Sequence, residues 1–380
     1  MISARLLERA TTHIGFSISL CLAVASLFSV VFPRFAAAGE VPTFAVDPSW
    51  PKQLPNNWIL GQIGGITVDW QGHIWVIQRP RSLNDAEKYA TLNPPRGKCC
   101  VPAPPVLEFD VDGNLLRSWG GPGEGYEWVG REHGIEVDDR GYVWIGGNAD
   151  NDSELLKFSL DGKYLGQIGK IAPRTNSNDT TQLGRPAEVA IDKAANELYV
   201  ADGYGNRRII VFDATTLAYK RHWGGYGKPP NDDPQPPYDP SQPPQAQFRN
   251  PVHCIKIAGD LVYVCDRSQN RIQVFRKDGT FVNEWFYEKN SRGDGAVFDL
   301  AVWPDAKQTW LLNADGTNNE IRIIRREDGS VVGTFGQSGR NAGQFALLHV
   351  MAVDAKGNVY TGEVEGKRIQ KFRLTSDALK

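Results

Sequence analysis

Histidines recur in this sequence at one position of an internal repeat. Six short apolar segments align with one another along the chain, and the residue two places before the segment is histidine in every second copy. The six residues at this position are Gly64, His133, Ala187, His253, Phe298 and His349. Neutral imidazole is the commonest protein metal ligand, and three histidines with an open fourth position are typical of catalytic zinc. If six such units close into a ring, the three imidazoles point at one axis and can share a metal ion.

Charged and phenolic residues lie at a second position of the same repeat, where the next predicted strand ends. This position gives Arg79 in the first unit, Tyr204 in the third and Arg267 in the fourth. Arginine forms a planar fork that matches a carboxylate, and a tyrosine beside cations could act as a base. Each of the three also has a purely structural interpretation, because Asp-Arg and Asp-Gly pairs are common turn sequences after a strand.

The repeating units predict how these residues are positioned. Each unit has an alternating apolar segment, an Asp/Gly turn, a second strand rich in Tyr, Trp and Val, and two further strands, as in Leu261-Val-Tyr-Val-Cys-Asp266 followed by Ile272-Gln-Val-Phe275. Repeats of roughly 50 residues with this composition are typical of β-propellers. We therefore expect an all-β fold, a six-bladed β-propeller in one domain over residues 40–374. Residues 43–46 are expected to add the outer strand of the last blade and close the ring.

Two insertions and two cysteine pairs interrupt the repeats. The insertions run from about Pro80 to Pro105 and from Gly227 to Gln245, and either could cover a site at one end of the ring. Cys254 and Cys265 lie symmetrically about a predicted hairpin turn, so they could form a cross-strand disulfide or remain two buried thiols. The adjacent Cys99-Cys100 pair is not expected to bond to itself.

Composition and the N-terminus indicate an exported globular protein. The 380 residues are 41% hydrophobic with a formal net charge of −2, and the absence of a basic stripe argues against nucleic-acid binding. Residues 1–38 are typical of a signal peptide, with two early arginines, an apolar stretch from Ile14 to Phe32 and small residues at 36–38. We expect a secreted or periplasmic protein with no membrane association after cleavage. An uncleaved anchor is the alternative.

Three stretches carry a resemblance to a known family. Val200-Ala-Asp-Gly-Tyr-Gly-Asn-Arg-Arg-Ile209, Asn250-Pro-Val-His253 and Val264-Cys-Asp-Arg-Ser-Gln-Asn-Arg-Ile272 resemble peptidyl-α-hydroxyglycine α-amidating lyases, which are six-bladed propellers of NHL-type repeats. The resemblance implies one Zn²⁺ held by His133, His253 and His349. It also implies a catalytic Tyr204 and two active-site arginines, Arg79 and Arg267.

The implied reaction cleaves a carbinolamide into an amide and glyoxylate. Zinc would bind the α-hydroxyl, Tyr204 would remove its proton, and the arginines would hold the carboxylate of a small-molecule or peptide substrate. The sequence departs from the family after the third histidine, where Val350 replaces an Asp that helps to bind structural calcium, so Ca²⁺ is doubtful. The family's cysteine after the catalytic tyrosine is here Gly205.

Two other functions remain open at this point. A metal-dependent hydrolase or lactonase could use the same propeller site, since fold alone does not separate these chemistries. A non-catalytic NHL scaffold that binds its partners at the rim is the third possibility, and it predicts no bound metal.

Overall fold

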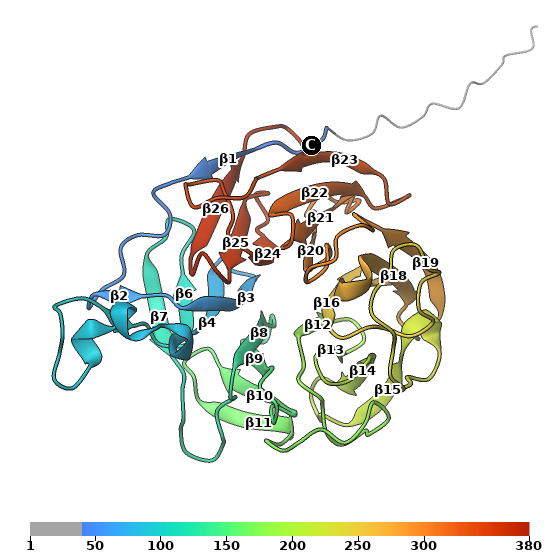
Figure 1. The fold of residues 1–380 in the computed structure, drawn as a ribbon, viewed down its shortest axis with the longest axis horizontal. Coiled ribbons are helices and arrows are strands. Elements are labelled where there is room, and N and C mark those ends of the chain that lie inside the picture. The colour runs from blue at the N-terminus through green and yellow to red at the C-terminus, as the bar shows by residue number, and fades with distance from the viewer. Residues whose placement is uncertain (1–39, 380) are drawn as a thin grey trace, which may run out of the picture. The chain divides into compact units, whose positions relative to one another are not determined.

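A computed structural model describes residues 40–379. Six four-stranded antiparallel sheets are arranged around a central axis as the blades of a β-propeller (Figure 1), which confirms the predicted all-β fold and blade number. The predicted signal peptide at residues 1–38 lies outside the described residues. Within residues 40–379, no helix has the length and apolar character needed to cross a membrane.

In the first five blades the strands run from the axis outward in chain order, and in the last blade the N-terminal strand β1 takes the outermost place. The first three blades contain β3 (Gln62–Val68), β4 (Ile74–Arg79), β6 (Val106–Phe109) and β7 (Leu115–Trp119); β8 (Glu132–Val137), β9 (Tyr142–Gly147), β10 (Glu154–Ser159) and β11 (Tyr164–Gly169); and β12 (Glu188–Asp192), β13 (Glu197–Asp202), β14 (Arg208–Asp213) and β15 (Tyr219–Trp223). The last three contain β16 (Val252–Ala258), β17 (Leu261–Asp266), β18 (Arg271–Arg276) and β19 (Phe281–Phe286); β20 (Asp299–Val302), β21 (Trp310–Asp315), β22 (Glu320–Arg325) and β23 (Val331–Phe335); and β24 (Leu348–Val353), β25 (Val359–Glu363), β26 (Ile369–Leu374) and β1 (Phe44–Asp47).

The N-terminal strand closes the ring, as the sequence predicts. β1 pairs antiparallel with β26, from Phe44 opposite Leu374 to Asp47 opposite Lys371, and so completes the last blade. The Phe44 ring packs against Phe335 and Trp303 of the preceding blade, with ring centroids 4.5 and 6.0 Å apart. The first strand of the described chain therefore holds the last blade in place.

An aspartate at the end of the innermost strand organises the first turn of several blades. In blade 1, Asp69 accepts hydrogen bonds from the backbone N–H groups of Gln71 and His73 and from the indole N–H of Trp75. Asp138 does the same with Trp144 in blade 2, and Asp354 of blade 6 accepts from two backbone N–H groups and from the Tyr360 hydroxyl. An Asp side chain suits this role because it can mimic a backbone turn, and the contact fixes a large buried aromatic residue between blades.

The insertions carry short 3₁₀ turns and one small sheet. The first contains η1 (Pro80–Ser82), η2 (Asp85–Glu87), η3 (Tyr89–Thr91) and β5 (Val101–Pro102), which pairs in parallel with β2 (Trp58–Ile59). The second begins at η4 (Gly225–Gly227), and η5 (Arg267–Gln269) follows β17.

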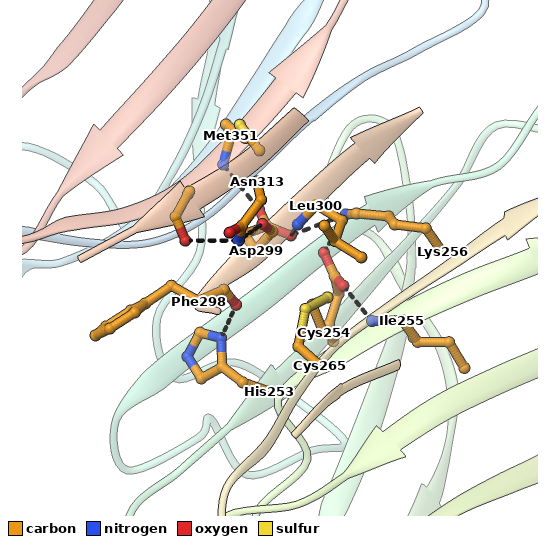
Figure 2. Close-up of a disulfide and its surroundings, with 12 residues drawn as sticks. His253, Cys254, Ile255, Lys256, Cys265, Phe298, Asp299, Leu300, Asn313 and Met351 are labelled. Carbon is orange, nitrogen blue, oxygen red and sulfur yellow. Dashed lines mark hydrogen bonds and ion pairs between the residues drawn. A yellow bond between two sulfur atoms is a disulfide. The ribbon is translucent and has the colours of Figure 1, made fainter. Parts of the chain in front are cut away.

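Both cysteine pairs are disulfides in the structure. Cys254 of β16 lies opposite Cys265 of β17 and bonds to it, next to His253 (Figure 2). Cys99 and Cys100 also bond to each other, so the expectation that this adjacent pair stays unbonded was wrong. A cis peptide bond joins the two residues, a geometry that the sequence does not indicate.

The closing strand predicts the cost of truncating Phe44. Because this half-buried ring fills the junction between β1 and blade 5, Phe44→Ala should lower the free energy of unfolding by about 2 kcal/mol. Urea denaturation measures it. Leu116→Ala, at a side chain that is 44% exposed, is the control and should change stability by less than about 0.5 kcal/mol. Equal effects of the two substitutions would contradict this role of β1.

Candidate metal centre and active site

Three histidines come from the innermost strands of alternate blades. His133 lies on β8, His253 on β16 and His349 on β24. Each strand shifts register against its neighbour next to the histidine, and such β-bulges re-aim side chains. All three residues are buried, with at most 2% of their surface exposed. The structure therefore brings together the three residues that the repeat position predicts.

Each imidazole is anchored by a backbone carbonyl of the next blade. The Nδ1 atoms lie 2.8 Å from Ala187 O for His133, 2.6 Å from Phe298 O for His253 (Figure 2), and 2.8 Å from Ile63 O for His349. A carbonyl oxygen can only accept, so Nδ1 carries the proton in the neutral ring and Nε2 has a free lone pair. Blades with a histidine thus supply the candidate metal ligands, and the blades between them supply the carbonyls that anchor these ligands.

The Nε2 atoms converge on one point near the axis. His253 Nε2 lies 3.2 Å from His349 Nε2, and the phenol oxygen of Tyr204 lies 3.0 Å from the Nε2 atoms of both His133 and His253. The three ring centroids form a nearly equilateral triangle with sides of 5.0 to 5.1 Å. One phenol proton cannot satisfy three lone pairs at once.

This donor set fits a metal ion. Two unprotonated nitrogens 3.2 Å apart repel each other unless a cation lies between them, and tetrahedral zinc places its nitrogen ligands about 3.3 Å apart. Burial, together with the charges of nearby arginines, lowers the pKa of all three histidines well below 6.5 and keeps the rings neutral. Hydrogen bonds from Nδ1 to carbonyls are also the usual support for metal-binding histidines.

The loop after β13 places Tyr204 beside this cluster. Gly203 and Gly205 flank the tyrosine, and a Cβ atom on either would collide with the backbone of Val252 or Gly184. The Asn250 amide donates to the Gly203 carbonyl at 2.7 Å and so holds the loop from the next blade. Small residues on both sides of Tyr204 therefore let the loop press against its neighbours and fix the phenol.

Both predicted arginines lie near the three histidines, at the same end of the central channel of the propeller. Arg267 Nη1 donates to the Tyr204 oxygen at 3.3 Å, and its guanidinium lies 4.6 Å from the Phe298 ring centroid. Arg79 donates to the Glu132 carbonyl at 2.8 Å and to the Gln62 side chain at 3.2 Å. Burial lowers the pKa of Arg79 to about 10, which leaves it cationic at neutral pH.

The arginines keep unused hydrogen-bonding capacity. The Nε of Arg267 is buried and, among the described residues, has no hydrogen-bond partner. The Asp294 carboxylate lies 3.9 Å from Arg267 Nη2, and its side chain is 65% exposed. Buried donors without partners are rare and call for an explanation, and a carboxylate on a bound molecule would supply one.

Sequence reasoning missed several parts of the site. It gave no role to the carbonyls of Ala187 and Phe298, although both residues occupy the histidine position in their own blades. Their place at that position of the repeat could have predicted this role. Nothing in the repeat pattern predicts that the Phe298 ring lies under Arg267 or that the Gln62 side chain lies beside Arg79.

The residues near Val350 do not fit a calcium site. Val350 lines a small hollow of about 10 Å³ together with Glu188 and Asp299. The Lys256 ammonium pairs with both carboxylates, at 3.3 Å from Asp299 Oδ1. Calcium needs six or more oxygen ligands, whereas here an apolar side chain and an ammonium group occupy the surroundings.

Two other groups in the described chain have metal-like composition but are internally satisfied. His73 Nδ1 lies 2.8 Å from Glu108, which also accepts from Arg117. In the group formed by Cys254 with Glu188 and Asp299, the cysteine is already in a disulfide. The three-histidine group is therefore the metal candidate we pursue.

Comparisons with known proteins agree with this fold. No protein-family model matches the chain. The chain is 26% identical over 350 residues to mouse NHL repeat-containing protein 3, covering 88% of this chain and 85% of that protein. It is 24% identical over 331 residues to a probable peptidyl-α-hydroxyglycine α-amidating lyase of Caenorhabditis elegans, covering 83% of each. Peptidyl-α-hydroxyglycine α-amidating lyase 2 of Drosophila melanogaster is 27% identical over 354 residues, covering 89% and 77%.

Homologues of this propeller therefore include amidating lyases and NHL repeat-containing proteins. The lyase homologues support a lyase of this kind, at identities of 24 to 27%. Among solved structures, a Bacteroides thetaiotaomicron protein of unknown function matches with a TM-score of 0.50 and 15% identity, covering 83% of this chain and 70% of that one. That likeness bears on the fold alone.

The geometry predicts the metal content of the purified protein. Wild type should retain about one zinc ion per chain, and His133→Ala, His253→Ala and His349→Ala should each lose it while remaining folded. Elemental analysis after gel filtration measures the stoichiometry. His73→Ala, which removes a histidine from a satisfied group, is the control and should keep the metal. Retention of the metal by all three axial variants would contradict a shared site.

The lowered histidine pKa values predict how the metal-free protein responds to acid. The unfolded chain binds protons near pH 6.5 and the folded chain does not, so stability falls as pH falls through that range. Each histidine contributes up to about 1.4 kcal/mol per pH unit. Urea titrations of metal-free protein between about pH 7 and pH 5 should show a steeper loss in wild type than in His349→Gln. Equal slopes would show that His349 does not stay neutral in the folded state.

Proposed function

We propose that this protein is a metal-dependent lyase. It cleaves the C–N bond of a peptidyl-α-hydroxyglycine, or a related carbinolamide, to give an amide and glyoxylate. The observation that carries the proposal is the convergence of three unprotonated Nε2 atoms with the Tyr204 phenol and the Arg267 guanidinium. The amidating lyases among the homologues support the same reaction class.

His133, His253 and His349 would hold the metal, which we propose to be zinc. When bound, zinc supplies Lewis-acid polarisation of a substrate oxygen. The chain's own contribution is a rigid, neutral set of ligands, since the three Nδ1 anchors fix each ring before any metal binds.

Tyr204 moves the proton in this proposal. Its oxygen lies 3.0 Å from two of the ligand nitrogens, which places it within hydrogen-bond reach of a hydroxyl group held there. As phenolate, Tyr204 accepts the proton of the α-hydroxyl while the C–O bond becomes the carbonyl of glyoxylate and the C–N bond breaks. The phenol then returns the proton to the amide nitrogen, so no oxidant or covalent intermediate is needed.

Arg79 and Arg267 orient the substrate carboxylate. Arg267 has a buried Nε without a partner in the described chain, and its positive charge 3.3 Å from the Tyr204 oxygen stabilises negative charge there. When the arginines hold the substrate carboxylate, the α-hydroxyl is fixed relative to the Tyr204 phenol. This orientation lowers the activation barrier for proton transfer.

We also propose that the protein acts outside the cytosol. The Cys254–Cys265 disulfide supports this proposal, because such bonds persist mainly in oxidising compartments.

The proposal predicts the behaviour of Tyr204→Phe. Loss of the proton acceptor should lower kcat for glyoxylate release from an N-acyl-α-hydroxyglycine by about 10²-fold or more, with the metal content unchanged. Rates are measured above the uncatalysed breakdown of the same compound. Tyr219→Phe, at a residue that is 41% exposed, is the control and should keep full activity. A metal-loaded wild type without activity on any such compound, or full activity in Tyr204→Phe, would overturn the proposal.

A further inference from the structure

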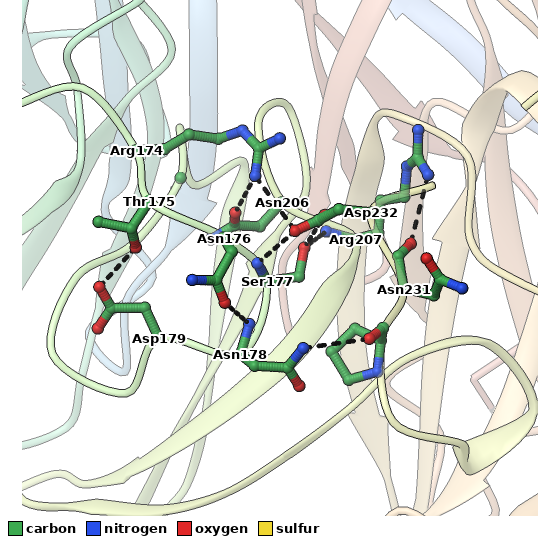
Figure 3. Close-up of polar contacts among 12 residues, drawn as sticks. Arg174, Thr175, Asn176, Ser177, Asn178, Asp179, Asn206, Arg207, Asn231 and Asp232 are labelled. Carbon is green, nitrogen blue, oxygen red and sulfur yellow. Dashed lines mark hydrogen bonds and ion pairs between the residues drawn. The ribbon is translucent and has the colours of Figure 1, made fainter. Parts of the chain in front are cut away.

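The second insertion is a loop at the rim of blades 3 and 4, and hydrogen bonds hold it against the rest of the propeller. We call residues 228–248 the proline-rich loop. Its Asp232 accepts hydrogen bonds from the Ser177 backbone N–H at 2.8 Å and hydroxyl at 2.6 Å, and from Arg174 at 3.5 Å (Figure 3). Arg207 donates to the carbonyls of Asn231 and Asp233. The upstream half of the loop is therefore tied to blade 3 and to the segment that joins blades 2 and 3.

The downstream half of the loop is tied to blade 4. The Tyr238 hydroxyl donates to the Lys289 carbonyl at 2.8 Å, in the segment that follows β19. Arg249, which follows the loop and precedes β16, donates to the Pro236 carbonyl, and within the loop Gln235 donates to the Phe248 carbonyl. Because hydrogen bonds to the neighbouring segments and within the loop hold it, the space beneath the loop is a built feature of the molecule.

Three arginines meet in that space. A hollow of about 290 Å³, here called the arginine hollow, is lined by Arg207, Arg249 and Arg292 together with Tyr238, Asn250 and Ser268. No Asp or Glu is among its lining residues. Asp239, an exposed residue of the loop, interacts electrostatically with Arg292. The hollow is therefore a concentration of positive charge.

One of these arginines has a buried donor without a partner. Arg249 Nε is buried and makes no hydrogen bond within the described chain. Burial lowers the pKa of Arg249; the Asp266 carboxylate acts in the opposite direction, and the neighbouring Arg207 lowers the pKa further. An anion bound between Arg207 and Arg249 would offset the repulsion of their like charges and would accept a hydrogen bond from Arg249 Nε.

The arginine hollow adjoins the candidate active site. Asn250, which lines the hollow, donates to the carbonyls of Gly203 and Asn206 on either side of Tyr204. Ser268, which also lines the hollow, directly follows Arg267. The hollow therefore shares Asn250 with the contacts that hold the Tyr204 loop, and it lies next to Arg267 along the chain.

We propose that the arginine hollow binds a carboxylate on the acyl portion of the substrate. This inference rests on the proposed function and makes it more specific, since it selects acidic peptides. Such a substrate carries two carboxylates, one at the reacting carbon beside Arg79 and Arg267 and one in the hollow. Arginine forks suit carboxylates because they bind both oxygens.

Binding of two unreactive peptides tests the inference without turnover. N-acetyl-Glu-Gly and N-acetyl-Gln-Gly differ only in one carboxylate and lack the α-hydroxyl, so neither can react. Calorimetric titration of the metal-loaded protein at low salt should show that the glutamyl peptide binds about tenfold tighter or more. Arg249→Gln and Arg292→Gln should each remove this difference. Arg373→Gln, at an exposed residue of β26 in the last blade, is the control and should keep it.

The outcomes separate this inference from the proposed function. Among the described residues Arg292 makes no hydrogen bond to the loop, whereas Arg249 does, so the Arg292 variant stays informative if Arg249→Gln folds poorly. Equal binding of the two peptides by wild type, or a preference retained in Arg292→Gln, would overturn the inference. A clear glutamyl preference supports it, and that preference without lyase activity would count against the proposed function alone.

Discussion

The hydrogen bond from each imidazole Nδ1 to a carbonyl of the next blade is the interaction on which the candidate site depends. It fixes the tautomer, so that three lone pairs face one point in the channel. It also crosses every second blade junction, and one of these junctions joins His349 of the last blade to Ile63 of the first. The three candidate ligands therefore converge only when the last blade, completed by β1, packs against the first.

The two ends of the central channel are lined by differently charged residues. At the histidine level, Arg79 and Arg267 provide positive charge beside neutral rings. Farther along the same strands, Lys256 lies among Glu188, Asp299 and Glu136, and burial raises the pKa of Glu136 to about 7. The end of the channel with the histidines thus carries uncompensated positive charge, and the far cluster balances its own carboxylates with an ammonium group.

The repeat made much of this arrangement predictable. Alternating apolar segments with Asp/Gly turns fix the strands, and the position of a residue within the repeat fixes which side chains approach the axis. That is why His133, His253, His349, Tyr204 and Arg267 could be found from spacing. Contacts made outside the repeat could not be found, because loop geometry determines them. The pinning of the proline-rich loop through Asp232 and the bond between Cys99 and Cys100 are of this kind.

The central claim is that one metal ion lies where the three Nε2 atoms converge. A crystal structure of zinc-loaded protein, with anomalous diffraction recorded on both sides of the zinc edge, tests this claim most directly. We expect one strong anomalous peak about 2.0–2.1 Å from each Nε2 atom, with the Nδ1 hydrogen bonds unchanged. A peak at the His73 group instead, or flipped imidazoles with Nδ1 as ligands, would contradict the account.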